Sequence, residues 1–311
     1  MNNQKVIIFV DVHFNRYLSK SVLGKIFSIN IAEIPMLLHF PGLPLEWEDL
    51  SKTDHLHYPL SAPEISKRYK YGDEDILYGF PHSYPTGSSI VEKVVLSFEI
   101  TEVEIEEKNN IIRKEVEKVM NIFQKLFYIV NESVNPTAIV KQSDCRIDLY
   151  NDSTGNRIKN QDEIEIIGYM HDDMNSISKK QLEIMLGIIN RKINIPIEYD
   201  FLISAIRAYE HHDYRKCILD LSTACEISIT SKIEELQSNL DIKNILEDYK
   251  TLAVKYRLLG LLNYDTSFAD ISVITNVRNK AIHKGQQIDS KQAYEAIKVT
   301  RTILKRLSIF Y

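Results

Sequence analysis

The segment Asn194-Ile195-Pro196-Ile197 marks the position at which the composition of this chain changes most sharply. All nine prolines lie between Pro35 and Pro196, and none occurs in residues 197–311. Because proline costs about 3 kcal/mol inside a helix, a proline-free tract rich in Leu, Ile, Ala, Lys and Glu predicts a mostly helical region. We therefore predict an N-terminal domain over residues 1–195 and a helical domain over residues 197–311.

The overall composition is that of an ordinary globular protein large enough for two domains. The chain has 311 residues, 44% of them hydrophobic and 26% charged, which argues against a disordered or fibrous protein. Residues 197–311 carry 16 Lys and Arg against 15 Asp and Glu (+1), and the remainder carries 22 against 28 (−6), which gives the net charge of −5. This balance argues against a protein that coats nucleic acid through general basicity, but it allows a local basic site.

The cysteines and the hydropathy pattern predict a cytoplasmic protein without a membrane partner. Cys145, Cys217 and Cys225 are odd in number and lack the spacing of metal ligands, which favours a reducing compartment. No apolar run approaches the roughly 18 residues that a membrane span requires. The apolar run at residues 6–10 is interrupted by Asp11 and no small-residue cleavage site follows it, so we expect no signal peptide.

The N-terminal domain has a mixed pattern. Tracts rich in Val, Ile and Phe with partial alternation predict strands, and apolar residues at helical spacing predict helices. The predicted strands are 5–14, 94–105 and 163–170, the predicted helices are 111–130 and 178–191, and residues 35–85 are predicted to be loops around short elements. Together with the helical C-terminal domain, this pattern predicts an α+β fold.

The C-terminal domain is predicted to be a bundle of about five helices. The predicted helices cover residues 199–210, 214–237, 242–262, about 265–283 and about 290–307, with a turn at His211-His212-Asp213 between the first two. Helix-start signals precede the last two: Asp265, Thr266 and Ser267 are N-cap candidates for the fourth helix, and Asp289 or Ser290 for the fifth. Gly285 is placed to end the fourth helix.

The segment Val277-Arg278-Asn279-Lys280-Ala281-Ile282-His283-Lys284-Gly285 is the one that suggests chemistry. Asn279 and His283 are four residues apart and therefore share a helix face. Arg278 and His283 are five apart, which places them about 140° from each other around an ideal helix. They converge on one phosphate only if the helix end is distorted or if the site faces a second copy of itself across a two-fold interface.

These residue types suit cleavage of RNA without a metal. That reaction requires removal of a proton from the 2′-hydroxyl, protonation of the leaving 5′-oxygen and stabilisation of added negative charge on the phosphate. A histidine that titrates near neutrality can act as general base or acid, and an arginine donates a planar fork of hydrogen bonds to phosphate oxygens. Asn279 is suited to orienting the imidazole or contacting the ribose.

The segment resembles the RNxxxH motif of HEPN domains, which are helical domains of many prokaryotic toxins, antiphage effectors and RNA-guided ribonucleases. Residues 208–217, followed by Ala224-Cys225-Glu226, look like the first two helices of that family, and residues 290–307 look like its closing helix. The resemblance covers about a third of the chain, and the N-terminal domain resembles no family that we recognise.

The resemblance implies a metal-independent endoribonuclease that cuts RNA as a homodimer and needs no cofactor. It implies that Arg278 and His283 are catalytic and that Asn279 supports them. Glu226 is similar to an acidic position often found in the second helix of the family. A toxin or antiphage role, including abortive infection, follows from the same resemblance, and the N-terminal domain is then the place where a trigger ligand or protein would bind.

Two alternatives to a ribonuclease stay open from the sequence alone. Residues 209–226 also resemble a tetratricopeptide-like helix pair, so the bundle would bind a partner without catalysis, although such solenoids need about three repeats. A HEPN-like bundle that binds RNA or nucleotides without cutting them is the other. Basic residues near the motif, Lys280, Lys284 and Lys291, are candidates for RNA binding, but a solvated outer helix face explains the recurrence of lysine equally well.

Overall fold

The computed structural model describes residues 3–12, 17–43, 60–66, 77–83, 88–130, 147–151, 176–237, 251–283, 286–308 and 310. The chain divides into two compact units, and the described residues fall into one unit that ends at Ile193 and a second that begins at Asn194. The first contains strands and helices and the second only helices, so the predicted α+β class is confirmed. The predicted strand at 163–170 lies outside the described residues.

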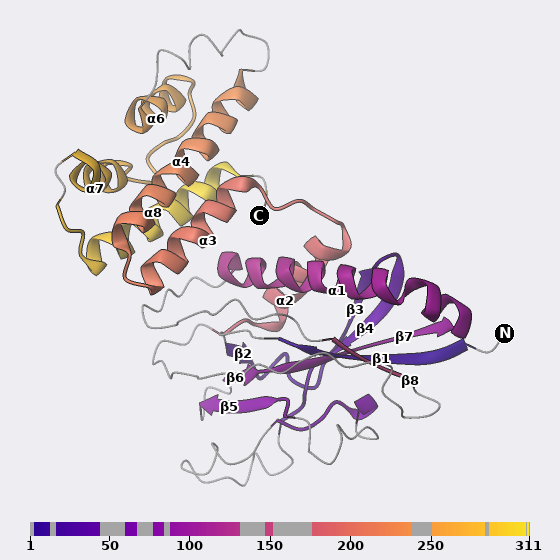
Figure 1. Ribbon diagram of the computed structural model, residues 1–311. Helices are drawn as coiled ribbons and strands as arrows, with labels where there is room; N and C mark the ends of the chain where they lie inside the picture. Colours follow the sequence, from indigo (N-terminus) through magenta and orange to yellow (C-terminus); the bar gives the residue numbers. More distant parts are fainter. Residues whose placement is uncertain are drawn as a thin grey trace. The chain divides into compact units, whose positions relative to one another are not determined.

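A five-stranded antiparallel sheet forms the centre of the first unit (Figure 1). Its strands lie in the order β3 (Ile26–Ile31), β4 (Ile34–His39), β7 (Lys93–Thr101), β1 (Asn3–Asp11), β8 (Ile147–Asn151). A second sheet has the order β2 (Tyr17–Ser19), β6 (Ser88–Val91), β5 (Gly79–Ser83), and a short 3-10 helix covers Glu64–Ser66.

The two central strands pair along their full length, from Asn3 opposite Thr101 to Asp11 opposite Lys93. All five residues from Val6 to Val10 are buried, and so are residues 94–98 of β7, so the sheet is covered on both faces along these two strands. Strands buried on both faces have continuous apolar runs instead of strict alternation, which explains the sequence pattern. A buried polar pair joins β4 to β7, with His39 Nε2 and Ser97 Oγ 2.8 Å apart.

Helices α1 (Glu102–Val130) and α2 (Lys179–Asn190) pack against the sheet through β3 and β7 (Figure 1). A capping box at Ser178 and Gln181 begins α2, as the helical prediction for 178–191 requires. The prediction of a strand as far as residue 105 was wrong, since β7 ends at Thr101 and α1 begins at the next residue. Val103 and Ile105 alternate with Glu102 and Glu104 in a strand-like period of two, and this local signal misplaced the boundary.

The second unit contains α3 (Ile197–Glu210), α4 (Tyr214–Leu236), α6 (Leu252–Leu261), α7 (Ser272–His283) and α8 (Ser290–Leu307). The predicted first, second and fifth helices are confirmed within about two residues, and the turn at His211-His212-Asp213 is where the sequence places it. Helices α3, α4 and α8 pack on one another, while α6 and α7 pack on α4 (Figure 1).

Both cysteines of α4 lie in the core of the second unit. Cys217 and Cys225 are fully buried, and burial raises the pKa of each thiol to about 12. The Cys225 Sγ lies 3.5 Å from Thr300 Oγ1 of α8. Thiols that are buried and protonated behave as small apolar side chains, so these two residues belong to the core.

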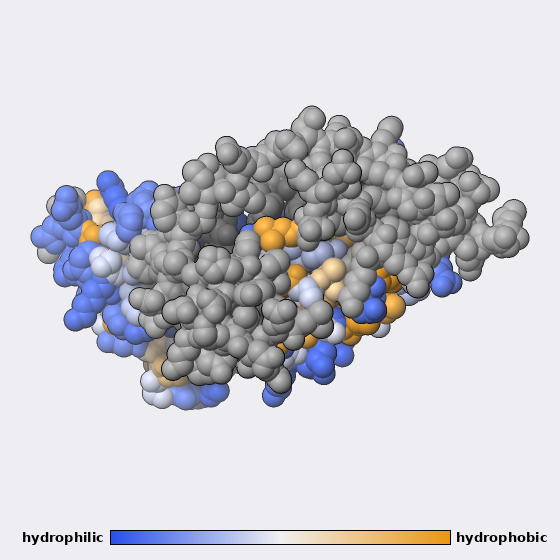
Figure 2. All heavy atoms as spheres, turned by 90° about the horizontal axis from the view of Figure 1, so that it is seen from below, coloured by the Kyte–Doolittle hydropathy of each residue, from blue (hydrophilic) through white to orange (hydrophobic). Residues whose placement is uncertain are grey.

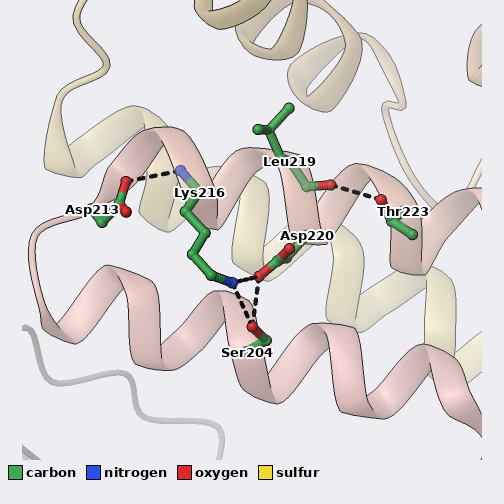
Figure 3. Close-up of polar contacts among 6 residues, drawn as sticks. All are labelled: Ser204, Asp213, Lys216, Leu219, Asp220 and Thr223. Carbon is green, nitrogen blue, oxygen red and sulfur yellow. Dashed lines mark hydrogen bonds and ion pairs between the residues drawn. The ribbon is translucent and has the colours of Figure 1, made fainter.

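A polar cluster joins α3 to the first turns of α4 (Figure 3). Ser204 Oγ donates to Asp220 Oδ2 at 2.7 Å and accepts from Lys216 Nζ at 2.7 Å, and Lys216 also forms an ion pair with Asp220. Asp213 begins α4 by accepting a hydrogen bond from the Lys216 backbone N–H at 3.0 Å. The contacts among Ser204, Lys216 and Asp220 hold α3 and α4 against each other.

Candidate functional site

The loop that leads into α7 is held by Tyr256 of α6. Its hydroxyl donates to the carbonyl oxygens of Thr266, at 2.7 Å, and Ala269, at 3.1 Å. Burial is the largest cause that raises the pKa of Tyr256 to about 12. The hydroxyl therefore stays protonated and remains a donor at physiological pH.

The fourth predicted helix starts later than the sequence indicates. Asp265 Oδ1 accepts hydrogen bonds from the Ser267 N–H at 2.9 Å and from its hydroxyl at 2.7 Å, which forms a local turn instead of a helix cap. The carboxylate of Asp270 accepts from the Ser272 N–H at 2.9 Å, and α7 begins there. The prediction that residues 265–267 cap the helix was wrong, because the carbonyl of Thr266 is bound by Tyr256 and does not accept a helical hydrogen bond.

The inner face of α7 consists of Ile274, Val277 and Ala281, all buried. This apolar stripe at positions i, i+3 and i+7 packs the helix on α4 and α8. Its position determines which residues of the motif are accessible, since Arg278 and Lys280 flank the stripe and Asn279 lies opposite it.

The described residues of the motif are available to a ligand. Arg278 and Lys280 are half-buried and Asn279 is exposed. None of their side chains forms a hydrogen bond or ion pair with another residue in the part of the chain that the structure describes. His283 is the last residue of α7, and its side chain, like Lys284 and Gly285, lies outside the described part.

The described chain resumes after α7 at Gln286 and enters α8 at Ser290. The Gln286 N–H donates to the Lys280 carbonyl at 3.2 Å, and a capping box at Asp289 and Gln292 begins α8. Lys291, in the first turn of α8, is exposed. Figure 2 shows mainly hydrophilic residues on the described surface at the left of the view, which is the side on which α8 begins in Figure 1.

Glu226 lies elsewhere on α4 and has a partner of its own. Its carboxylate forms an ion pair with Lys255 of α6, with Nζ and Oε1 2.8 Å apart, and the same ammonium donates to Thr230 Oγ1 at 3.3 Å. Among the described residues no hydrogen bond or ion pair joins Glu226 to α7. The structure thus gives Glu226 a role in packing α6 on α4.

An aromatic cluster that the sequence analysis did not single out lies at the end of the unit where α3 stops and α4 and α8 begin. Its members are Tyr209, His212, Tyr214 and Tyr294. The ring centroids of Tyr209 and Tyr214 are 5.5 Å apart, those of Tyr209 and Tyr294 6.3 Å, and those of His212 and Tyr214 6.0 Å. Burial, followed by the neighbouring Tyr214 and Tyr294, raises the pKa of Tyr209.

Comparisons with protein-family models, with curated protein sequences and with solved structures found no match to this chain. In the described residues there is no helix with the length and apolar character needed to cross a bilayer. The same residues contain no group of three or more His, Cys, Asp or Glu side chains arranged to hold a metal ion.

The groups at the end of α7 suit the recognition of a phosphodiester. Arg278 offers up to five N–H donors in a planar fork that matches two phosphate oxygens, and Lys280 and Lys291 supply further positive charge. Asn279 can donate to or accept from a ribose hydroxyl. Because α7 is helical through residue 283, positions 278 and 283 stay about 140° apart around the helix axis, and the helix end has no distortion that would bring them to one side.

Proposed function

We propose that the second unit is a HEPN-type endoribonuclease that cuts RNA without a metal ion or other cofactor. The observation that carries the proposal is the sequence Arg278-Asn279-x-x-x-His283 at the end of α7, where Arg278 and Asn279 form no side-chain hydrogen bond or ion pair with other described residues. A half-buried arginine without such a partner is unusual in a site whose only purpose is structural, since guanidinium groups at packed positions are normally paired.

In the proposed reaction, the 2′-hydroxyl oxygen of one nucleotide attacks the adjacent phosphorus and the bond from phosphorus to the 5′-oxygen breaks. The imidazole of His283 in one protomer takes the hydroxyl proton, and the imidazolium of the other protomer gives a proton to the leaving oxygen. Arg278 binds the non-bridging phosphate oxygens, which carry more negative charge in the transition state than in the ground state. The products are a 2′,3′-cyclic phosphate and a 5′-hydroxyl.

The homodimer belongs to this proposal because the spacing of the motif requires it. One helix presents Arg278 and His283 on different sides, whereas two helices related by a two-fold axis bring one pair from each copy to a shared phosphate. A site of this kind is assembled only when two copies meet, and dimerisation therefore offers a point of control. The first unit is the part we propose to bind the trigger.

We expect purified protein to cut labelled RNA in the presence of excess EDTA, since no step of the proposed reaction uses a metal. The rate should be the same after prolonged dialysis against the chelator, and each cut should leave a 2′,3′-cyclic phosphate on the upstream fragment and a 5′-hydroxyl on the downstream fragment. End-labelling with and without phosphatase identifies these termini. Loss of cleavage in EDTA that returns with Mg²⁺, or products with 5′-phosphates, would contradict the mechanism.

The biological role that we propose is that of a toxin or antiphage effector acting on RNA inside the cell. The resemblance to HEPN effectors supports it. Induced expression of the wild-type chain in a bacterial host should then stop growth within about one doubling time, whereas His283→Ala at equal abundance should leave growth unchanged. Equal growth of the two strains, with wild-type protein folded and cutting RNA in vitro, would contradict this role while leaving the activity intact.

A further inference from the structure

Part of the ring surface of the aromatic cluster is exposed to solvent and does not pack against the helices. Tyr209 is buried at its centre and fills the space between α3, α4 and α8. Tyr214 and Tyr294 on either side of it are only half-buried, and His212 is exposed. The ring of His212 is held in place, with its Nδ1 2.9 Å from the Tyr214 hydroxyl oxygen. A fixed group of partly exposed rings is the kind of surface on which nucleobases stack.

Positive charge lies directly against this surface. The ammonium of Lys298 is 4.4 Å from the ring centroid of Tyr294, and it also forms an ion pair with Glu295 at 3.1 Å. Lys291 is exposed one helical turn before Tyr294. A cation above an exposed ring is held more weakly than a stacked base, so a base that stacks on Tyr294 displaces Lys298 toward the phosphate. Rings alternating with lysines match the alternation of bases and phosphates in a single strand.

The position of the cluster connects it to the candidate site. Tyr209 is in the last turn of α3, Tyr214 is the first residue of α4, and Tyr294 is in the second turn of α8. Helix α7, which carries Arg278, packs on α8, which carries Tyr294. The cluster therefore includes a residue of the helix on which the motif helix packs.

We propose that the aromatic cluster binds an unpaired base of single-stranded RNA, stacked on Tyr294 or Tyr214, while Lys291 and Lys298 bind the adjoining phosphates. This inference rests on the proposed ribonuclease function and names its substrate as single-stranded RNA. Paired bases have both faces covered by their neighbours in the duplex, so a stacking surface selects bases outside a helix. The cluster thus sets which phosphate reaches the cleavage site.

The test is the affinity of the full chain for a fluorescent, fully 2′-O-methylated RNA oligonucleotide, which lacks the attacking hydroxyl and cannot be cut. We expect Tyr294→Leu to weaken binding about 5- to 100-fold, the range that follows from loss of one stacked base. Tyr294→Phe keeps the ring and should bind within about twofold of wild type. An oligonucleotide of abasic sites should bind wild type and Tyr294→Leu equally, because it carries phosphates but no bases.

A matched control is available at the opposite end of the unit. Tyr264 is also half-buried under a lysine, with Lys232 Nζ 5.5 Å from its ring centroid. Its hydroxyl donates to the carbonyl of Arg306, about 18 Å along α8 from Tyr294. Tyr264→Leu should therefore leave affinity for the oligonucleotide unchanged, and melting curves should show that both variants are folded.

Each result bears on the proposal separately from the question of catalysis. The proposal is wrong if wild type and Tyr294→Leu bind the oligonucleotide with equal affinity, or if wild type does not bind it. It is also wrong if Tyr294→Leu and Tyr264→Leu lose the same amount of affinity. Tighter binding of a duplex than of the single strand would contradict it as well. Binding that depends on the Tyr294 ring in a protein that cuts no RNA would support the base site and reject the proposed ribonuclease.

Discussion

His283→Ala is expected to reduce the rate of RNA cleavage by roughly 10²- to 10⁴-fold, the range that general acid–base catalysis contributes. In the proposed dimeric site the substitution removes both proton-transfer groups, so the upper part of that range is the relevant one. Affinity for the uncleavable 2′-O-methyl oligonucleotide should change little, because the cluster and the lysines that bind it are intact. The measurement is the single-turnover cleavage rate with enzyme in excess over RNA.

Arg278→Ala should give a loss of similar size for a different reason, since it removes stabilisation of the charge that develops on the phosphate oxygens. Arg278→Lys keeps the charge but replaces a planar fork with a single ammonium, and we expect it to restore only part of the rate. Arg257→Ala, at an exposed arginine of α6, is the matched control and should leave the rate unchanged. If His283→Ala folds and cuts RNA at the wild-type rate, the assignment of the catalytic site is wrong.

The helices of the second unit could be predicted because their sequence signals agree with one another. Apolar spacing, the absence of proline and the cap at Asp289 all indicate the same boundaries for α8, and the structure has them. The start of α7 could not be predicted, since Asp265 and Asp270 are equally good caps by residue type. A hydroxyl from another helix, that of Tyr256, decides between them by binding carbonyls of the preceding loop.

The hairpin of β3 and β4 shows a second kind of failure. Its two strands are joined by Ala32 and Glu33, which have φ angles of 52° and 65°. Two-residue turns with two positive φ angles normally carry Asn-Gly or Asp-Gly, and those residues are the signal by which a hairpin is read from sequence. Here α2 binds the hairpin beside the turn, since the Asn190 side chain accepts from the Asn30 N–H at 2.8 Å and donates to the Ser28 carbonyl at 3.1 Å. The residues Ala32 and Glu33 themselves give no sequence signal of the turn.

The candidate site also has one part that could be predicted from sequence and one part that could not. A local motif on one helix could be found from sequence, because Arg278, Asn279 and His283 lie within six residues. The aromatic cluster could not, since Tyr209, Tyr214 and Tyr294 come from three helices, and the packing of α4 and α8 on α3 brings them together. Glu226 had a family-like position, but its ion pair with Lys255 depends on where α6 lies.

Leu259→Ala is expected to destabilise the second unit by about 2–5 kcal/mol, which is the usual cost of removing a fully buried leucine side chain. Leu259 is 0% exposed on the inner face of α6, whereas Leu261, two residues later in the same helix, is 74% exposed. The substitution Leu261→Ala removes the same atoms from solvent-exposed positions and should change stability by no more than about 0.5 kcal/mol. Urea unfolding followed by far-ultraviolet circular dichroism measures both.

A comparison of Leu259→Ala with His283→Ala distinguishes a loss of folding stability from a loss of catalysis. Helix α6 positions the loop before α7 through Tyr256, so a cavity at Leu259 lowers the fraction of folded protein and loosens the start of α7. The motif lies at the other end of α7, and the cleavage rate per folded molecule should fall far less in Leu259→Ala than in His283→Ala. The histidine variant should instead keep the wild-type unfolding midpoint. If Leu259→Ala and Leu261→Ala unfold at the same urea concentration, the packing of α6 described by these burial values is wrong.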